Sequence, residues 1–394
     1  MVDAGDRLIL EPLKFAQPCY GEEEARAAAD VIRSGWVVGG PRLAEFEGEF
    51  ARRCGTSLGV GVSSWTTGAF LVLKAWGIGP GDEVIVPSLT FIATVNVVVH
   101  VGATPVFADV NFSTFNIDPE DVARKVTTRT RAIIPVDQIG LPSDIDAMNT
   151  IASKHGLHVL EDSACAYGSR NHGRPVGSLA KVTVFSLQAR KLVTTGEGGM
   201  ILTEDAEFAQ KLRTLRHQGM SLSDLSRHGA PPTHFETYPE VGYNARLTDI
   251  QAAIGIVQLA RTEQLLARRR RVAAVYNDYL VEHPWLERPY VPEGLEHNWQ
   301  SYQVKVRDAA PLTRNAIMDR LFKCGVPTRR GVMASHLEPP YRGLGTSLPN
   351  TEHVVANTFL LPIHSGMSDA QARFVLHALD EIFNARQMFP SLVR

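Results

Sequence analysis

The stretch His158-Val-Leu-Glu-Asp-Ser-Ala164 decides the fold class, because it is one of several short apolar runs that each end in polar residues. The other runs are Glu83–Pro87, Pro105–Val110, Ala132–Val136 and Val182–Ser186. Segments with helical spacing separate them, such as Ile145–His155, which Gly156 is expected to end. This alternation predicts an α/β fold with a mainly parallel sheet sandwiched by helices.

The pattern changes in the second half of the chain. Thr248–Leu280 reads as one long helix, and a Pro- and Trp-containing stretch follows at Pro284–Trp299. A smaller α/β unit is predicted after it, with a strand at Gln300–Val306 and helices near Pro311–Lys323 and Ser368–Phe383. We therefore expect a large domain over residues 1–250, and over residues 251–394 a linking helix with a small C-terminal domain.

The composition excludes several classes of protein. With 394 residues, 44% hydrophobic and 21% charged, the chain suits a soluble protein of about two domains. A formal net charge of −2 gives no electrostatic reason to expect a nucleic-acid partner. The basic run Arg268–Arg271 lies in the predicted long helix, and we interpret it as a solvated face.

Cysteine and histidine spacing argues against metal and disulfide sites. The four cysteines are far apart, without a C-x-x-C pair, which suits a reducing compartment: Cys19, Cys54, Cys165 and Cys324. The 13 histidines form no H-x-x-x-H or H-E-x-x-H pattern, so no metal site is expected. The N-terminus carries Asp3, Asp6 and Glu11 without a secretory signal, and no apolar stretch is long enough for a membrane span. A cytoplasmic location is expected.

The carboxyl ends of the predicted strands carry the candidate chemistry. Each strand ends in a polar residue: Ser88, Asp109, Asp137, Asp162 and Ser186. In open α/β sheets, ligands bind beyond this edge. Asp162 closes one strand, where the plain alternative is an aspartate that caps the following helix.

A lysine follows another of these strands closely, in Phe185-Ser-Leu-Gln-Ala-Arg-Lys191. An enclosed lysine near cationic neighbours can lose its proton and form a Schiff base, whereas the guanidinium of Arg190 stays protonated. The alternative is a surface lysine. The Gly-rich stretch Thr194-Thr-Gly-Glu-Gly-Gly199 follows and permits tight turns close to a bound group. It does not match a nucleotide-binding P-loop.

Together these three elements resemble the DegT–DnrJ–StrS family of sugar aminotransferases, which are pyridoxal-phosphate (PLP) enzymes of the aspartate-aminotransferase fold, fold type I. The resemblance covers nearly the whole chain. Further matching segments are Gly77–Val84, Pro87–Phe91, Gly102–Val106, Gly242–Arg246, Thr328–Gly331 and Leu361–His364.

The resemblance implies a role for each matching residue. Lys191 would hold the cofactor as a Schiff base and move the proton, and Asp162 would keep the pyridine nitrogen protonated. Phe91 would stack on the cofactor ring, with a core phenylalanine as the alternative. Phosphate contacts would come from Ser64, Trp65, Thr66, Ser186 and, from a neighbouring subunit, Asn244. A homodimer with shared active sites follows.

The sequence departs from the family pattern at two positions. Trp65 replaces a common glycine, so we expect it either to reshape the phosphate loop or to project into the substrate pocket. Cys165 stands where the family often has glutamine or histidine facing the cofactor's ring hydroxyl, and cysteine is a weaker hydrogen-bond partner.

The implied reaction transfers an amino group from L-glutamate to a keto-sugar, carried on a nucleotide diphosphate and reacting at a 3- or 4-keto group. Candidate substrate contacts are His217, Arg329, Arg330 and His336, since arginines suit phosphate or carboxylate oxygens. Each has a structural alternative. Three rival functions remain on the same fold: a keto-cyclitol aminotransferase, a PLP-dependent sugar dehydratase, and a non-catalytic sensor. The presence of Lys191 and Asp162 argues against the last two.

Overall fold

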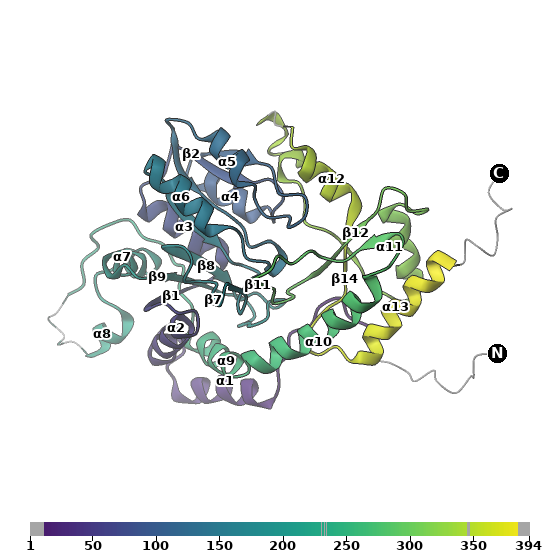
Figure 1. Cartoon of the computed structure of the whole chain (residues 1–394). Helices are drawn as coiled ribbons and strands as arrows, with labels where there is room; N and C mark the ends of the chain where they lie inside the picture. The colour runs from purple at the N-terminus through teal and green to yellow at the C-terminus, as the bar shows by residue number, and fades with distance from the viewer. Residues whose placement is uncertain (1–11, 230, 232, 234, 345–346, 385–394) are drawn as a thin grey trace.

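The computed structural model describes residues 12–229, 231, 233, 235–344 and 347–384. Within them, a seven-stranded sheet and a four-stranded sheet are joined by helices (Figure 1). The acidic residues Asp3, Asp6 and Glu11 lie outside the described residues. None of the helices described combines the length and apolarity that a membrane crossing requires.

The elements alternate along the first half of the chain, as the sequence predicts. The α-helices are α1 (Glu22–Ser34), α2 (Pro41–Arg53), α3 (Trp65–Ala75), α4 (Ala93–His100), α5 (Pro119–Lys125), α6 (Ile145–His155), α7 (Ala206–Arg216), α8 (Asp224–Gly229), α9 (Asp249–Ala260), α10 (Thr262–Leu280), α11 (Arg314–Lys323), α12 (Pro349–Asn357) and α13 (Asp369–Asn384). The strands are β1 (Leu58–Val62), β2 (Glu83–Pro87), β3 (Thr104–Ala108), β4 (Thr130–Ile133), β5 (His158–Asp162), β6 (Arg170–Asn171), β7 (Arg174–Pro175), β8 (Val182–Ser186), β9 (Gly199–Thr203), β10 (Leu286–Glu287), β11 (Leu295–Glu296), β12 (Tyr302–Val306), β13 (Arg329–Arg330) and β14 (Thr358–Leu361).

The large sheet has the order β1-β9-β8-β5-β4-β2-β3. Strands β3, β2, β4, β5 and β8 are parallel to one another, whereas β9 runs antiparallel to both β8 and β1. The predicted mainly parallel sheet is therefore confirmed, and β2, β5 and β8 have the bounds that the sequence predicts. Helix α6 also ends as expected, because Gly156 adopts a left-handed conformation with φ 67°.

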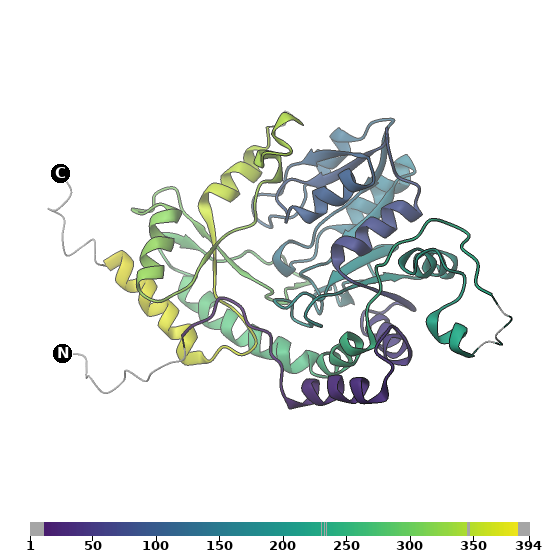
Figure 2. The same cartoon turned by 180° about the vertical axis from the view of Figure 1, so that it is seen from behind.

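Alternate residues of the strands point to opposite faces of the large sheet. Val84 and Val86 of β2 belong to the core beneath α3, α4 and α7, whereas Ile85 belongs to the core beneath α5 and α6. Phe185 of β8 packs with α2 and α9 on that second face. Helices thus cover both faces, which leaves the strand ends as the free edge (Figures 1 and 2).

The predicted single long helix is two helices. Helix α9 ends before Arg261, whose ψ of 4° departs from helical geometry, and α10 begins at Thr262. The Arg261 guanidinium is drawn toward α1, where it pairs with Glu24. Helix α10 then continues to the C-terminal unit, a sheet of order β10-β12-β14-β13 packed against α11 and α13 (Figure 2).

The interpretation of the arginine run as a solvated face is wrong for Arg269. Its side chain is 2% exposed, and its Nη1 donates to the carbonyls of Trp299 and Gln300 at 3.0 and 2.9 Å. Nε donates to Ser365 Oγ at 3.3 Å. A cation at this position is stabilised by neutral oxygens, so it fastens α10 to the chain that enters β12.

Candidate active site

Lys191 lies in the loop that leads from β8 to β9. Its side chain is partly buried, and Nζ donates a hydrogen bond to Cys165 Sγ at 3.1 Å. The amide of Lys191 donates to the Gln188 carbonyl at 2.8 Å, which closes a tight turn. The alternative of a surface lysine is therefore not observed: the amine points toward the end of β5.

The Gly-rich stretch brings this loop against the start of α3. Gly196 and Gly198 have φ of 85° and 155°, values that favour glycine. A Cβ on Gly199 would lie 2.6 Å from the carbonyl carbon of Ser64. Only glycine therefore allows this close approach, which sets Ser186 beside the first turn of α3, since Ser186 pairs with Gly199.

Asp162 is 3% exposed at the end of β5. Its carboxylate accepts hydrogen bonds from Thr94 Oγ1 at 2.8 Å and from the Ala164 amide at 3.1 Å. No helix begins at this point, so the alternative of a helix cap does not hold. Burial raises the pKa of Asp162 to about 6, and the two donors and the Lys191 charge act in the opposite direction.

Two more carboxyl groups are buried behind Asp162. Asp137 accepts from the Ser163 hydroxyl at 2.6 Å and from the Ser143 amide at 2.8 Å. Burial raises the pKa of Asp137 to about 7, and it raises the pKa of Glu161 well above its ordinary value, to which the Asp137 charge adds. A cation placed against Asp162 would relieve this crowding of negative charge.

The N-terminus of α3 has hydrogen-bond donors that could hold an anion. Ser64 caps the helix, because its Oγ accepts from the Thr67 amide at 3.1 Å. The next amides, of Trp65 and Thr66, have no acceptor within the helix, as in the first turn of any α-helix. Thr66 and Ser186 are both partly accessible beside them. Ser64, Trp65, Thr66 and Ser186, four of the residues expected to bind the phosphate, thus lie at one helix end.

The expectation that Trp65 projects into the substrate pocket is wrong. Its side chain is 5% exposed and belongs to the core under α3. The indole Nε1 donates to the Val184 carbonyl of β8 at 3.1 Å. The residue occupies the first position of α3 and does not adopt a positive φ. Only its backbone amide remains for a phosphate contact.

Phe91 is 63% exposed, so the alternative of a core phenylalanine is overturned. It follows β2 and lies where the C-terminal unit crosses the sheet edge. There the Thr90 amide donates to the Met333 carbonyl at 3.2 Å, and the Ser335 amide donates to the Ser88 carbonyl at 2.8 Å. The ring is available to cover a flat ligand bound between Asp162 and solvent.

The predicted substrate residues are not all free. His336 is 5% exposed, and its Nδ1 bonds to Ser88 Oγ at 2.6 Å while Nε2 bonds to Glu352 at 3.3 Å. It therefore joins β2 to α12. Arg329 and Arg330 are exposed on β13, just before the segment that crosses the sheet edge. Their substrate contacts remain predictions.

His217 and Asn244 face each other in an isolated antiparallel bridge. His217 is 9% exposed, and its Nδ1 bonds to Arg246 at 2.8 Å. Asn244 is exposed. The role of Asn244 at the site of a neighbouring subunit stays a prediction.

Three residues support the site without having been predicted. Thr94 donates to Asp162, and a signal for it exists: Thr90 and Thr94 stand four residues apart in an otherwise apolar segment. Asn298 Nδ2 donates to the Cys165 carbonyl at 2.8 Å, and Gln300 Nε2 donates to the Arg190 carbonyl at 2.7 Å. The last two come from the C-terminal half, and sequence spacing carries no signal for them.

Comparison with known proteins identifies the family. Residues 18–380 match the model of the DegT/DnrJ/EryC1/StrS aminotransferase family. The chain belongs to this family. It is 38% identical to the spore coat polysaccharide biosynthesis protein SpsC of Bacillus subtilis over 376 residues, which is 94% of this chain and 97% of SpsC.

Solved structures of the same fold cover nearly the whole chain. The aminotransferase TlmJ from Streptoalloteichus hindustanus is 34% identical, with a TM-score of 0.88 over 95% of this chain and all of TlmJ (100%). The PLP form of Spr1654 from Streptococcus pneumoniae is 28% identical, with a TM-score of 0.89 over 95% of this chain and 99% of Spr1654. The predicted fold type I and aminotransferase activity are confirmed.

Pyridoxal phosphate is the cofactor of this family, and the site suits it. A half-buried amine, a buried carboxylate that forms no ion pair within the described residues, and a helix N-terminus occupy one edge of the sheet. These match the aldehyde, the ring nitrogen and the phosphate of the cofactor respectively. Cys165 keeps its place beside the amine, so the residue that departs from the family pattern lies within the site.

The raised pKa of Asp162 leads to a stability prediction for the cofactor-free protein. Because the folded-state pKa lies near 6, above the ordinary 3.8, its stabilising contribution is present below pH 4 and is lost as the pH rises through about 6. Asp162→Asn removes this titration. We expect the variant to be more stable than the unsubstituted protein at pH 8, by about 3 kcal/mol, and nearly equal to it at pH 4, in urea unfolding.

Asp146→Asn provides the control, because the side chain of Asp146 is 61% exposed and pairs with Arg174 at the surface. It should shift the urea midpoint by a similar small amount at both pH values. A cofactor-free Asp162→Asn protein that is no more stable than the parent at pH 8 would show that burial does not strain this carboxylate.

Proposed function

We propose that the protein transfers the amino group of L-glutamate to a keto-sugar carried on a nucleoside diphosphate, at a 3- or 4-keto position. The observation that carries the proposal is the placement of Lys191 Nζ at the end of β5, 3.1 Å from Cys165 Sγ and close to the buried Asp162. The matching polysaccharide-biosynthesis protein supports a sugar as the acceptor.

The residues of this chain divide the work. When bound, the cofactor supplies an electron sink for the carbon that loses its proton. Lys191 holds the cofactor and then takes up and returns that proton through its Nζ. Asp162 keeps a positive charge on the facing nitrogen, because a buried carboxylate strongly favours a nearby cation. Phe91 covers the exposed face.

A nucleotide acceptor is favoured over a cyclitol by the two exposed arginines of β13. Neither ring nitrogen of His336 is free, so Arg329 and Arg330 are the more accessible of the predicted substrate residues. Guanidinium groups suit the paired oxygens of a diphosphate. Arg330 lies 3.6 Å from Glu338, a surface pairing that a phosphate can replace. A keto-cyclitol, which lacks a phosphate, would have no group for these two guanidinium groups to bind.

A homodimer with shared sites also belongs to the proposal. The segment before Asn244 exposes large apolar side chains: Phe235 at 79%, Tyr238 at 57% and Val241 at 86%. Apolar groups gathered in this way suit a protein interface more than solvent. A second copy of the chain that covers them would bring Asn244 to the phosphate at the start of α3.

The amino donor is tested with the visible absorbance of the lysine-bound cofactor. We expect L-glutamate to abolish this band in the purified protein, with release of 2-oxoglutarate, because the amino group moves to the cofactor. Adding a nucleotide-linked keto-sugar should restore the band and yield an amino-sugar detected by mass spectrometry. A keto-cyclitol should not restore it.

Two variants control this experiment. Lys191→Ala should lack the band and the reaction, whereas Arg190→Ala, an exposed neighbour in the same loop, should retain both. A band that glutamate leaves unchanged would rule out the proposed donor. Recovery with a keto-cyclitol alone would replace the sugar acceptor with a cyclitol.

Shared sites predict complementation between two inactive variants. In a mixed dimer of Lys191→Ala and Asn244→Ala, one site carries both substitutions and the other carries neither. Random reassociation after dissociation should therefore restore about one quarter of the parental activity, since half of the dimers are mixed and each has one intact site. Failure to recover activity, with mixed dimers demonstrated by native mass spectrometry, would place Asn244 in its own subunit's site.

A further inference from the structure

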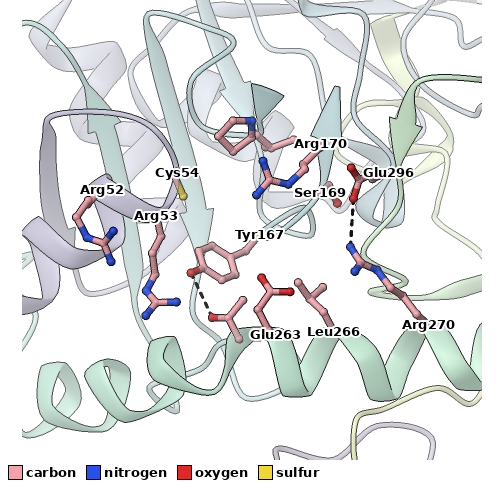
Figure 3. A pocket seen from close by; sticks show the side chains of 14 residues that line it. Arg52, Arg53, Cys54, Tyr167, Ser169, Arg170, Glu263, Leu266, Arg270 and Glu296 are labelled. Atoms are coloured by element: carbon pink, nitrogen blue, oxygen red, sulfur yellow. Dashed lines mark hydrogen bonds and ion pairs between the residues drawn. The ribbon is translucent and has the colours of Figure 1, made fainter. Parts of the chain in front are cut away.

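A cavity of about 560 Å³ lies between α10 and the segment that leads to β12. It is separate from the residues assigned to the cofactor and the acceptor. Arg270, Arg288, Tyr290, His297 and Trp299 line it, together with Glu296. A neighbouring cavity of about 310 Å³ shares Arg270 and Glu296, whose ion pair of 3.3 Å is visible at its edge (Figure 3).

His297, which lines this cavity, has a buried ring nitrogen without a hydrogen-bond partner among the described residues. Its side chain is 5% exposed, and Nδ1 accepts from the Trp299 amide at 2.8 Å, so the remaining ring proton sits on Nε2. Nε2 has no hydrogen-bond partner among the described residues. Burial lowers the pKa of His297 to about 3, so the ring is a neutral donor. Such a donor is costly to bury unless an acceptor satisfies it.

The walls combine positive charge with flat rings. Arg288 is exposed and forms no ion pair within the part of the chain that is described, and the partner of Arg270 is the exposed Glu296. Tyr290 is 58% exposed, while Trp299 lies against His297 with ring centroids 4.4 Å apart and planes 3° from parallel. Guanidinium groups bind phosphate oxygens, and an exposed ring stacks on a planar ligand.

Residues 297–300 connect this cavity to the active site, because alternate residues of the segment face each of them. His297 and Trp299 line the cavity, whereas Asn298 donates to the Cys165 carbonyl and Gln300 bonds to the loop of Lys191 on both sides of that lysine. The segment is strained at Trp299, whose φ is 56°. The buried Arg269 also holds two carbonyls of this segment. A ligand that displaces His297 or Trp299 would therefore also displace the neighbouring residues that contact Cys165 and the loop of Lys191.

We propose that this cavity binds a nucleoside phosphate, with the phosphate on Arg270 and Arg288 and the base against Tyr290, and that its occupant acts on the Lys191 loop through residues 297–300. The volume suits a ligand of this size. The site is distinct from the acceptor position at β13 and does not depend on which acceptor the enzyme uses.

Calorimetric titration of the holoenzyme with uridine and adenosine 5′-diphosphates tests the proposal. Arg288→Ala and Tyr290→Ala should each weaken one binding event at least tenfold. Arg307→Ala, an exposed arginine of the same unit that pairs with Glu287 outside the cavity, should leave that event unchanged. Arg330→Ala marks the acceptor position and should also leave it unchanged.

The second readout is the absorbance of the bound cofactor, which the nucleotide should shift in the parental enzyme but not in Arg288→Ala. Three results would contradict the proposed binding site: binding that only Arg330→Ala removes, binding that is equal in all variants, or no binding at millimolar nucleotide. Binding that Arg288→Ala weakens but that leaves the absorbance unchanged would overturn the link to Lys191.

Discussion

The structure depends on one electrostatic constraint, the carboxylate of Asp162 buried at the end of β5 within reach of Lys191. Burial opposes the charged form, and the buried Asp137 and Glu161 behind it increase the crowding of acidic groups. Thr94 and the Ala164 amide stabilise the charge only in part. A protonated ring nitrogen of the bound cofactor would supply the cation that this carboxylate lacks. The bound cofactor would therefore bring the positive charge that the fold itself does not place against Asp162.

The parallel sheet explains why Asp162 and Lys191 lie close together. Strands β5 and β8 are neighbours and run in the same direction, so their carboxyl ends lie at one edge. The alternation of short apolar runs with helical segments, and the polar residue that ends each run, predicted this arrangement from the sequence. The motif around Asp162, Lys191 and the Gly-rich stretch then indicated the family, which the family model and the structural comparisons confirm.

Other features could not be predicted, because they depend on contacts between distant segments. The helical pattern continues through Arg261, and the sequence gives no signal for the break there between α9 and α10, where the Arg261 guanidinium pairs with Glu24 of α1. Arginine runs are usually solvated, yet Arg269 is buried because carbonyls of the chain near Trp299 happen to face it. The direction of the Trp65 indole depends on the Val184 carbonyl of β8, which lies far away in sequence.

The central claim is that Lys191 carries the cofactor. Reduction of the purified protein with borohydride, followed by peptide mass spectrometry, tests it most directly, because reduction makes a Schiff base permanent. The account predicts a phosphopyridoxyl adduct on the peptide that contains Lys191 and on no other lysine peptide. An adduct confined to a different lysine, or none in protein that retains the visible absorbance, would contradict it.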